Sequence, residues 1–496
     1  MSLATNPMGT EDAASTQVKR RPTWILCTII AIAFFLAPCG VINHGDGEAR
    51  YAQTKALLLY NRLSIPPELA YTKNGDPIGN ILMAPNGQRY CKYGIGTSLV
   101  WLIPTSVAWI IHRSTGADLD TVAGFGISFV NPILAAATVW SLCWALRRLT
   151  VGRHAQLITV LLYLFGTSAL AYANTAFSEP LVGLLLFWAA ILPVIDDDVK
   201  AALVSGVLLT CCTLVKPELA LLPACLLPLF VGKQRRRALI AFCMTAALGA
   251  LFLALNNLVC RGSPTQFSYG DETFQFQSPL IGLTQQFYGI KRNLLLFNPA
   301  LLLALTGWVV LYRTARWRRL LVACLLVWVV YLPFYSSWYE WDGGMCFGPR
   351  FFQSFIPFTL LPGGFGLLWL AANARYSVWY GVVGVALCGF VLAIVPLQVA
   401  GLCIKNEEAV HISEITGRSE PWTHIQLMAL KLRRGIRHPE IYHKSDFTRL
   451  AAGEPDTVMD FRSKTTFQYL NHWWSIYLAN KLRNTNSRGL LSGCAP

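Results

Sequence analysis

The sequence predicts an all-α polytopic membrane protein with about 11–13 transmembrane helices, a long first outer loop with juxtamembrane helices, and a C-terminal surface-associated tail. Hydrophobic residues make up 54% of the 496 residues and charged residues only 14%, against about 25% charged in a soluble domain. The apolar residues also form many runs long enough to cross a bilayer. Because only helices and closed barrels satisfy their backbone hydrogen bonds in lipid, we predict that these runs are helical.

The apolar runs divide the chain into three regions. Residues 1–23 are predicted to form a cytoplasmic tail, because Lys19 to Arg21 precede the first apolar run. Residues 24–400 form the predicted transmembrane domain. Residues 401–496 form a tail of mixed composition, expected on the outer side, where apolar residues at helical spacing over 467–477 suggest a surface helix. The predicted spans are 24–42, 93–111, 121–146, 155–177, 180–195, 200–215, 218–232, 238–259, 294–312, 319–335, 351–371 and 377–400.

The basic residues predict the orientation of the chain, since short cytoplasmic loops are enriched in Lys and Arg. A cytoplasmic N-terminus places the first loop, residues 43–92, outside. Basic clusters at 233–237 and 313–319 mark inner loops, so 260–292 and 336–350 are expected outside. The net charge of +15 therefore does not indicate a nucleic-acid partner, because it is distributed over short loops between apolar runs.

A further basic segment, residues 147–153, conflicts with this alternation. It lies outside if 93–111 and 121–146 both cross the bilayer. It lies inside if 93–111 is a re-entrant segment broken at Pro104. The sequence does not decide between the two.

Two carboxylates, Asp46 and Glu48, follow the first apolar run directly. Gly45 and Gly47 flank Asp46 and would let the backbone approach a ligand closely. A carboxylate in this position suits a general base that takes a proton from an acceptor. The alternative is an ordinary polar loop with a helix cap. Residues 48–63 are expected to form an amphipathic helix that carries Arg50.

The first loop ends with two cations, Arg89 and Lys92, immediately before the next apolar run. They could simply extend toward lipid headgroups. The functional alternative is a grip on a lipid-linked phosphate, which lies at the same depth. The sequence favours neither interpretation strongly.

A second polar stretch, residues 335–352, combines aromatic residues with Glu340, Asp342 and Arg350. Interfacial aromatics usually form a belt. A belt does not require the Gly-Gly and Gly-Pro-Arg sequences found here, so we expect this stretch to contact substrate. Glu179 and Glu218 are weaker candidates, as ionisable residues between apolar runs. Glu218 could instead pair with Lys216, two residues away. No Cys or His spacing typical of a metal site is present in the sequence.

These motifs resemble those of GT-C superfamily membrane glycosyltransferases, in the branch of bacterial protein O-mannosyltransferases and aminoarabinose transferases. The resemblance spans roughly residues 45 to 350 and excludes the tail. It rests on Asp46–Tyr51, Lys92–Gly96, Ser178–Pro180, Trp341–Gly344 and Gly348–Phe351. It implies an inverting transfer from a polyprenyl-phosphate sugar donor to an envelope acceptor, at the outer face of a bacterial inner membrane. It implies no cofactor, and a divalent metal is not indicated.

The resemblance also implies roles for individual residues. Asp46 corresponds to the family's general base. Glu48 corresponds to its second acid, although Gly47 separates two residues that are often adjacent in the family. Lys92 and Arg350 correspond to contacts of the donor phosphate. With both lines of reasoning, the candidate catalytic residues are Asp46 and Glu48, and the candidate substrate-binding residues are Arg50, Arg89, Lys92, Glu179, Glu340, Asp342 and Arg350.

Two other functions are compatible with these features. A transporter or flippase of a lipid-linked sugar would also need many helices, interfacial aromatics and cations. Such proteins often contain inverted repeats with binding residues at mid-membrane depth, and no internal repeat is evident here. A glycan ligase or polymerase would share the chemistry and differ only in its acceptor. The sequence does not specify the donor sugar, the acceptor (lipid, glycan or protein) or the oligomeric state, and membrane lipids are the other expected partners.

Overall fold

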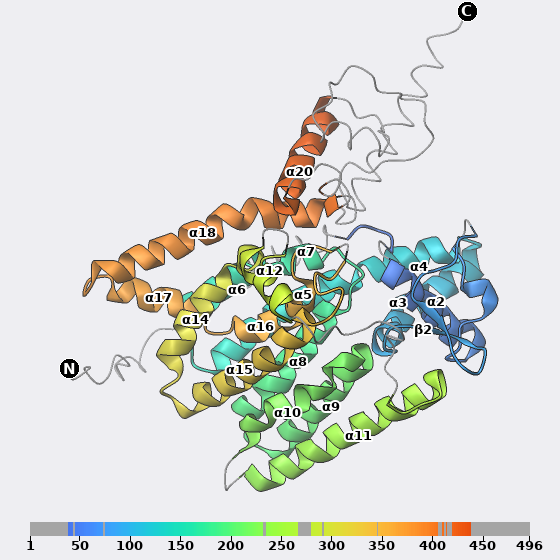
Figure 1. Cartoon of the computed structure of the whole chain (residues 1–496), viewed down its shortest axis with the longest axis horizontal. Helices are drawn as coiled ribbons and strands as arrows, with labels where there is room; N and C mark the ends of the chain where they lie inside the picture. Colours follow the sequence, from blue (N-terminus) through green and yellow to red (C-terminus); the bar gives the residue numbers. More distant parts are fainter. Residues whose placement is uncertain are drawn as a thin grey trace, which may run out of the picture.

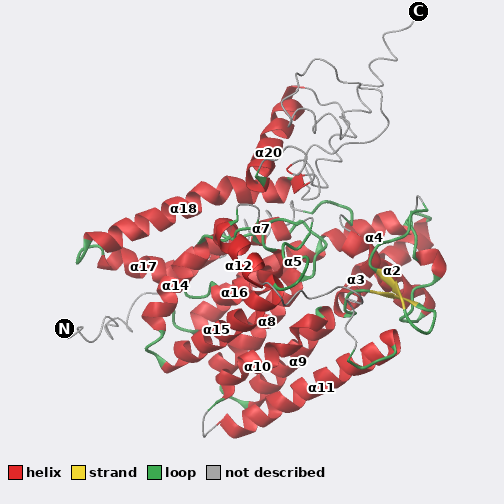
Figure 2. Ribbon diagram, in the orientation of Figure 1, coloured by secondary structure: helices red, strands yellow, loops and turns green. Residues whose placement is uncertain are grey.

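The computed structural model describes residues 38–42, 45–72, 75–231, 235–265, 279–289, 292–344, 346–404, 409–410, 413 and 419–437. The N-terminal tail, nearly all of the first predicted span and the helix expected at 467–477 lie outside these residues. The described part is built of helices, with one small antiparallel sheet in the first loop (Figure 2). Its two strands are β1 (Ile81–Met83) and β2 (Arg89–Cys91), with Leu82 opposite Tyr90.

Figure 1 shows the helices of the described residues. They are α2 (Gly45–Tyr60), α3 (Gly96–Thr115), α4 (Leu119–Ser128), α5 (Val130–Arg148), α6 (Arg153–Phe165), α7 (Ala169–Tyr172), α8 (Glu179–Ile195), α9 (Val199–Val215), α10 (Leu222–Leu226), α11 (Arg236–Arg261), α12 (Pro279–Tyr288), α13 (Leu294–Phe297), α14 (Ala300–Leu311), α15 (Ala315–Ser336), α16 (Ile356–Thr359), α17 (Gly363–Asn373), α18 (Val378–Cys403) and α20 (Glu420–Arg437). The 3-10 helices are η1 (Pro67–Leu69), η2 (Pro217–Leu221), η3 (Leu227–Phe230) and η5 (Arg350–Phe355).

The chain is an integral membrane protein. Among the described residues, four helical segments are long and apolar enough to cross a membrane, or five if one pair bent by 60° is a single span. The four are Leu119–Arg148, Arg236–Arg261, Ala315–Ser336 and Val378–Cys403, and the bent pair is Arg350–Thr359 with Gly363–Asn373.

Several predicted spans are divided or shortened in the structure. The run 218–232 is split among η2, α10 and η3, each of which begins at or next to a proline, Pro217, Pro223 or Pro228. Proline removes a helix hydrogen bond and so favours such breaks. Within the predicted span 155–177, helix α6 ends at Phe165. The next residue, Gly166, packs closely against Ala300. Pro104, in contrast, does not break its helix, because α3 is continuous through it. The break at Pro104 that the re-entrant alternative includes is therefore absent from α3.

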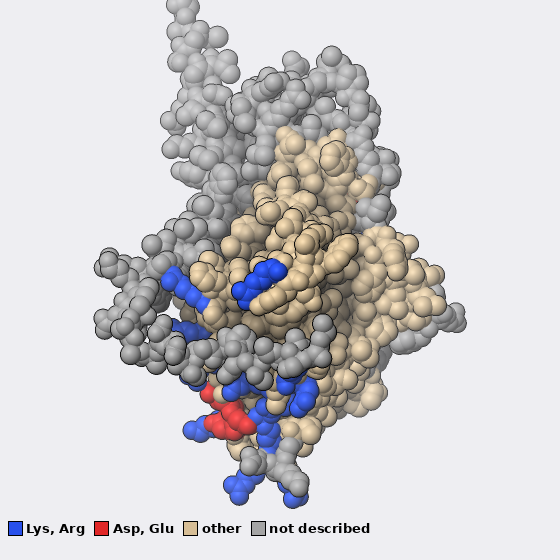
Figure 3. All heavy atoms as spheres, turned by 90° about the vertical axis from the view of Figure 1, so that its left-hand side faces the viewer, with Lys and Arg blue, Asp and Glu red and all other residues tan. Residues whose placement is uncertain are grey.

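Charged loops gather at one end of the helical bundle. Arg148 Nη2 lies 3.2 Å from Asp196 Oδ1, and Arg235 forms an ion pair with Asp197. The basic segment after α5 therefore lies at the same end as the basic cluster before α11, which the alternation of spans alone could not establish. We call this the basic end. Figure 3 shows one face on which cationic and acidic side chains gather toward the lower part and are sparse elsewhere.

A dense aromatic core supports the opposite end of α8 and α15. Tyr335 stacks on Phe351 with ring centroids 4.7 Å apart, and Trp328 stacks on Phe352 at 5.4 Å. These contacts fix η5 against α15, and α8 packs against η5 on its other side. This rigid apolar packing fixes the position of Arg350, the first residue of η5.

Candidate functional site

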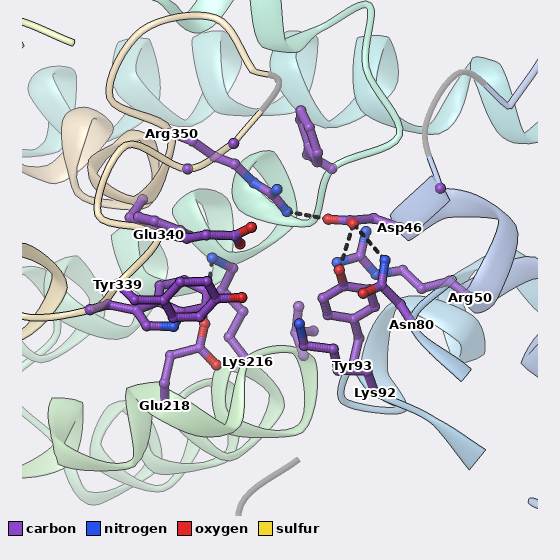
Figure 4. Close-up of a pocket in the computed structure, with 17 residues that line it drawn as sticks. Asp46, Arg50, Asn80, Lys92, Tyr93, Lys216, Glu218, Tyr339, Glu340 and Arg350 are labelled. Atoms are coloured by element: carbon purple, nitrogen blue, oxygen red, sulfur yellow. Dashed lines mark hydrogen bonds and ion pairs between the residues drawn. The ribbon is translucent and has the colours of Figure 1, made fainter. Parts of the chain in front are cut away.

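A cavity of about 280 Å³ lies where five segments meet: the start of α2, the chain before α3, the start of α8, the end of α9 and the loop before η5 (Figure 4). Its walls are rich in charge and in aromatic rings. The cations are Arg50, Lys92, Lys216 and Arg350, the acids are Asp46, Glu218 and Glu340, and the aromatic residues are Tyr93, Phe177, Trp338, Tyr339 and Phe351.

Asp46 is in the first turn of α2 and accepts three hydrogen bonds. The Tyr93 hydroxyl donates to Oδ1 at 2.5 Å, Asn80 Nδ2 donates to Oδ1 at 3.3 Å, and Arg350 Nη2 donates to Oδ2 at 2.6 Å. Close packing behind the helix requires Gly47, since a Cβ there would come within 2.6 Å of Ile42. This packing explains why a glycine separates the two acids of the motif.

Arg350 connects the two sides of the cavity. Its Nε donates to Glu179 Oε1 at 2.9 Å, while its Nη2 binds Asp46. Its guanidinium also lies 3.7 Å from the centre of the Phe177 ring, a cation–π contact that further fixes its plane. One arginine therefore joins α2 to α8 through two different nitrogens.

Glu179 is fully buried behind the cavity wall and binds a second cation. Lys216 Nζ lies 2.9 Å from Glu179 Oε1 and 3.6 Å from Glu218 Oε1. The ammonium also lies 5.2 Å from the Phe351 ring centre. Since Glu179 is shared by Arg350 and Lys216, it holds two cavity cations in place rather than contacting a ligand itself.

Helix α2 and the segment before α3 supply the remaining cations, Arg50 and Lys92. Arg50 stacks on the Tyr93 ring at 4.3 Å and donates to the Ala176 carbonyl at 3.2 Å, while Lys92 lies 5.9 Å from the same ring. Gly94 allows this segment to press against the end of α9, because a Cβ there would come within 2.2 Å of a backbone oxygen. The glycines of this motif therefore bring Lys92 and Tyr93 next to Asp46.

The cations around Asp46 determine its protonation. Burial alone would raise the pKa of its carboxyl group, but the charges of Arg350 and Arg50 and the Tyr93 hydrogen bond hold that pKa well below its usual range. Burial and the neighbouring Asp46 carboxylate both raise the pKa of Tyr93 above its usual value. Asp46 is therefore an anion and Tyr93 a neutral hydrogen-bond donor near neutral pH.

The structure brings six of the nine sequence-predicted residues together. Five of them line the cavity, and Glu179 supports it from behind. These six are Asp46, Arg50, Lys92, Glu179, Glu340 and Arg350.

Three predicted residues lie elsewhere. Glu48 lines a second cavity of about 600 Å³, because residues two apart project from opposite sides of a helix. Arg89 is not among the residues that line the first cavity, and its backbone pairs with Met83 in the small sheet. Asp342 accepts a hydrogen bond from the backbone nitrogen of Gly344 at 3.0 Å, so it shapes a turn. These three residues are not among those that line the first cavity, and their roles as catalytic or substrate-binding groups stay predictions.

The cavity is also lined by Lys216, Asn80 and Tyr93, which are not among the nine sequence-predicted residues. Lys216 was considered only as a partner of Glu218, although a lysine at the end of an apolar run is itself a signal. Tyr93 and Asn80 have no such signal, because only the folded first loop brings them to Asp46. Among the described residues, no group of three or more His, Cys, Asp or Glu side chains could hold a metal ion.

Comparison with known proteins gives structural similarity only. No protein-family model and no curated protein sequence matches the chain. The structure is similar to ArnT from Cupriavidus metallidurans, with 13% identity, a TM-score of 0.46, and coverage of 87% of this chain and 74% of that one. It is also similar to the Archaeoglobus fulgidus oligosaccharyltransferase in its apo form, with 11% identity, a TM-score of 0.47, and coverage of 91% and 62%. The same values hold for the archaeal enzyme AglB in complex with an inhibitory peptide and a dolichol-phosphate.

Proposed function

We propose that the chain is an inverting glycosyltransferase that moves a sugar from a polyprenyl-phosphate donor to an envelope acceptor. The observation that carries this proposal is a cavity lined by four cations, one of which, Arg350, binds the carboxylate of Asp46. Cations of this number would bind the phosphate of the donor and stabilise the charge that grows on it as it leaves. The family resemblance of the motifs supports the same reaction.

The reaction has one bond-forming and one bond-breaking step. An acceptor hydroxyl oxygen attacks the anomeric carbon, and the bond from that carbon to the phosphate oxygen breaks with its electron pair going to the phosphate. The acceptor proton passes to Asp46 as general base. Polyprenyl phosphate leaves, and the sugar is now bonded to the acceptor with its anomeric configuration inverted.

Donor binding would also make Asp46 a better base. In the free site, Arg350 and Arg50 lower the pKa of Asp46, and Arg350 binds it directly. A donor phosphate beside Arg350 would compete for that guanidinium and bring a negative charge close to Asp46. Both effects raise the pKa of the carboxyl group, so the base becomes effective only when the donor is present.

The other walls would hold the sugar and the lipid phosphate. Lys92 and Lys216 face the cavity opposite each other (Figure 4) and are assigned to the phosphate. Glu340 provides an acceptor for sugar hydroxyls, and Trp338 and Tyr339 provide apolar faces for a sugar ring. We assign the cavity to the outer face of a bacterial inner membrane, since the opposite, basic end has the character of a cytoplasmic surface.

Transfer of labelled sugar from bacterial lipid extracts by the purified protein tests this function. We expect turnover in the wild type and a loss of about 10²–10⁴-fold in Asp46→Asn, as for removal of a general base. Asp196→Asn, at the exposed basic end, is the matched control and should keep wild-type turnover. Thermal unfolding in detergent would verify that both variants are folded.

Two outcomes would contradict the proposal. Wild-type turnover in Asp46→Asn would remove Asp46 from the mechanism. A wild-type protein that transfers no sugar but moves lipid-linked sugar across liposomes would be a transporter. The acceptor supplied in the assay would distinguish transfer onto lipid or protein from glycan ligation.

A further inference from the structure

The C-terminal helix α20 is joined to the body of the protein by a buried ion pair. Glu420, the first residue of α20, is 1% exposed and Arg292 is 3% exposed. Arg292 Nη1 lies 2.5 Å from each oxygen of the Glu420 carboxylate. Figure 1 shows α20 standing on the end of α18, beyond the last predicted span. A segment outside the region of family resemblance thus places a charge inside the protein.

Arg292 also holds the loop that forms one wall of the cavity. We call residues 338–344 and 346–350 the site loop. Arg292 donates to the Gly344 carbonyl from Nη2 at 2.6 Å and to the Cys346 carbonyl from Nη1 at 2.9 Å. Gly343 and Gly344 both have positive φ angles, so this turn follows a path that other residues rarely adopt. Within the loop, the backbone nitrogen of Cys346 donates to the Gly344 carbonyl at 2.8 Å, and Arg292 adds a side-chain donor to the carbonyls of both residues.

The back of the site loop packs against the same C-terminal part of the chain. The Phe347 ring lies edge-on to the His424 ring of α20, with centroids 5.1 Å apart. On α18, a Cβ at Gly401 would come within 2.4 Å of Phe347. The front of the loop contributes Glu340 and Arg350 to the cavity. One side of the loop is therefore shaped by α18 and α20 while the other faces the ligand.

We propose that Glu420 and Arg292 are positioning residues for the transferase site, so that the C-terminal segment sets the shape of the site loop and the placement of Glu340 and Arg350. The catalytic consequence rests on the proposed function. Neither residue lines the cavity, and Glu420 acts through Arg292. Removing Glu420 would leave the Arg292 charge buried without its counter-charge, which favours movement of Arg292 and release of the two carbonyls.

Cys346 provides a measurement that does not depend on activity. It lies in the site loop and is fully buried, so a soluble maleimide should modify it slowly. We would measure modification of the Cys346 peptide by mass spectrometry in the full-length protein. We expect a rate increase of about tenfold or more in Glu420→Ala, a smaller one in Glu420→Gln, which keeps the side-chain shape, and none in Asp196→Asn, which removes an exposed ion pair at the basic end.

Sugar transfer by the same variants completes the test. We expect kcat to fall in parallel with the loss of Cys346 protection, with a smaller change in KM for the donor lipid, and Glu420→Asp to recover part of the loss because it keeps the charge. Continued protection of Cys346 in folded Glu420→Ala and Glu420→Gln would overturn the inference, as would an exposed Cys346 with unchanged kcat. If the wild type transfers no sugar, the proposed function fails, and the labelling still decides whether α20 holds the loop.

Discussion

The two ends of the helical bundle both carry ion pairs, and the Arg148–Asp196 pair at the basic end lies in a different environment from the network at the cavity end. At the basic end, the side chains of Arg148 and Asp196 are 52% and 45% exposed. At the cavity end, those of Glu179, Lys216 and Arg350 are 0%, 6% and 11% exposed. An exposed pair is screened by water and contributes little, whereas each member of a buried network depends on the others. Burial of every member therefore distinguishes the network at the cavity end from the pairs at the basic end, where Arg235 is buried but its partner Asp197 is 56% exposed.

The largest contrast is expected from removing one carboxylate at each end. Glu179→Gln should lower the free energy of unfolding by about 3–5 kcal/mol, because Arg350 and Lys216 lose the anion that they share. Asp196→Asn should lower it by at most about 1 kcal/mol. Thermal and denaturant unfolding in detergent would measure both. Equal losses would mean that the network at the cavity end is not the more strongly coupled one.

The next largest difference between the two ends is expected in kcat when an arginine at each end is replaced by lysine. Arg350 reaches Glu179 and Asp46 through different nitrogens, and a single ammonium group cannot reproduce that geometry. We expect Arg350→Lys to reduce kcat for sugar transfer about 10²–10³-fold. Arg148→Lys, at the basic end, should leave kcat unchanged. Nearly wild-type kcat in Arg350→Lys would show that a positive charge at this position is sufficient, without separate nitrogens for Glu179 and Asp46.

The same contrast explains how much could be predicted from the sequence. The membrane class follows from long apolar runs, and Asp46, Lys92 and Arg350 could be selected because they lie beside glycines at the ends of such runs. These are local signals. Glu179 was a weaker candidate, and its role as the shared partner of two cations depends on the hairpin of α8 and α9.

Other positions could not be predicted, also for physical reasons. Asp46 and Glu48 both lie in α2 and line different cavities, which depends on the helix beginning at Gly45. Asp342 accepts a hydrogen bond from the backbone of Gly344. This contact exists only in the folded loop and leaves no signal in the sequence, where Asp342 is therefore indistinguishable from a ligand contact. The contribution of α20 left no motif, since the Glu420–Arg292 contact joins residues 128 positions apart.

The pH dependence of transfer should reveal the coupling between Asp46 and Arg350. The lowered pKa of Asp46 in the free site keeps it ionised throughout the working range, so kcat/KM for the donor should show no acidic limb from this group. The stability that its ion pair contributes is likewise present above the ordinary aspartate pKa and lost only as pH falls through the lowered one.

In the donor complex, the phosphate should raise the pKa of Asp46. Because kcat reports groups in the bound complex, kcat should show an acidic limb from Asp46 that kcat/KM lacks over the same pH range. Rate profiles at saturating and limiting donor would measure this difference. The absence of that limb from kcat would mean that donor binding does not release Asp46 from Arg350. Arg148→Lys, which leaves the cavity unchanged, should show the wild-type profiles.

The smallest change in kcat is expected from substitution of Glu48, the acid on the other side of α2 from Asp46. Glu48 faces a cavity lined by Tyr51, Lys55 and Asp120, where Lys55 and Asp120 already form an ion pair of 3.1 Å. We expect Glu48→Gln to change kcat by no more than about twofold, because it does not contact the reacting atoms. Asp46→Asn, two residues away, is the matched comparison. A large loss in Glu48→Gln would show that the acceptor reaches around α2, and the second cavity would then belong to the active site.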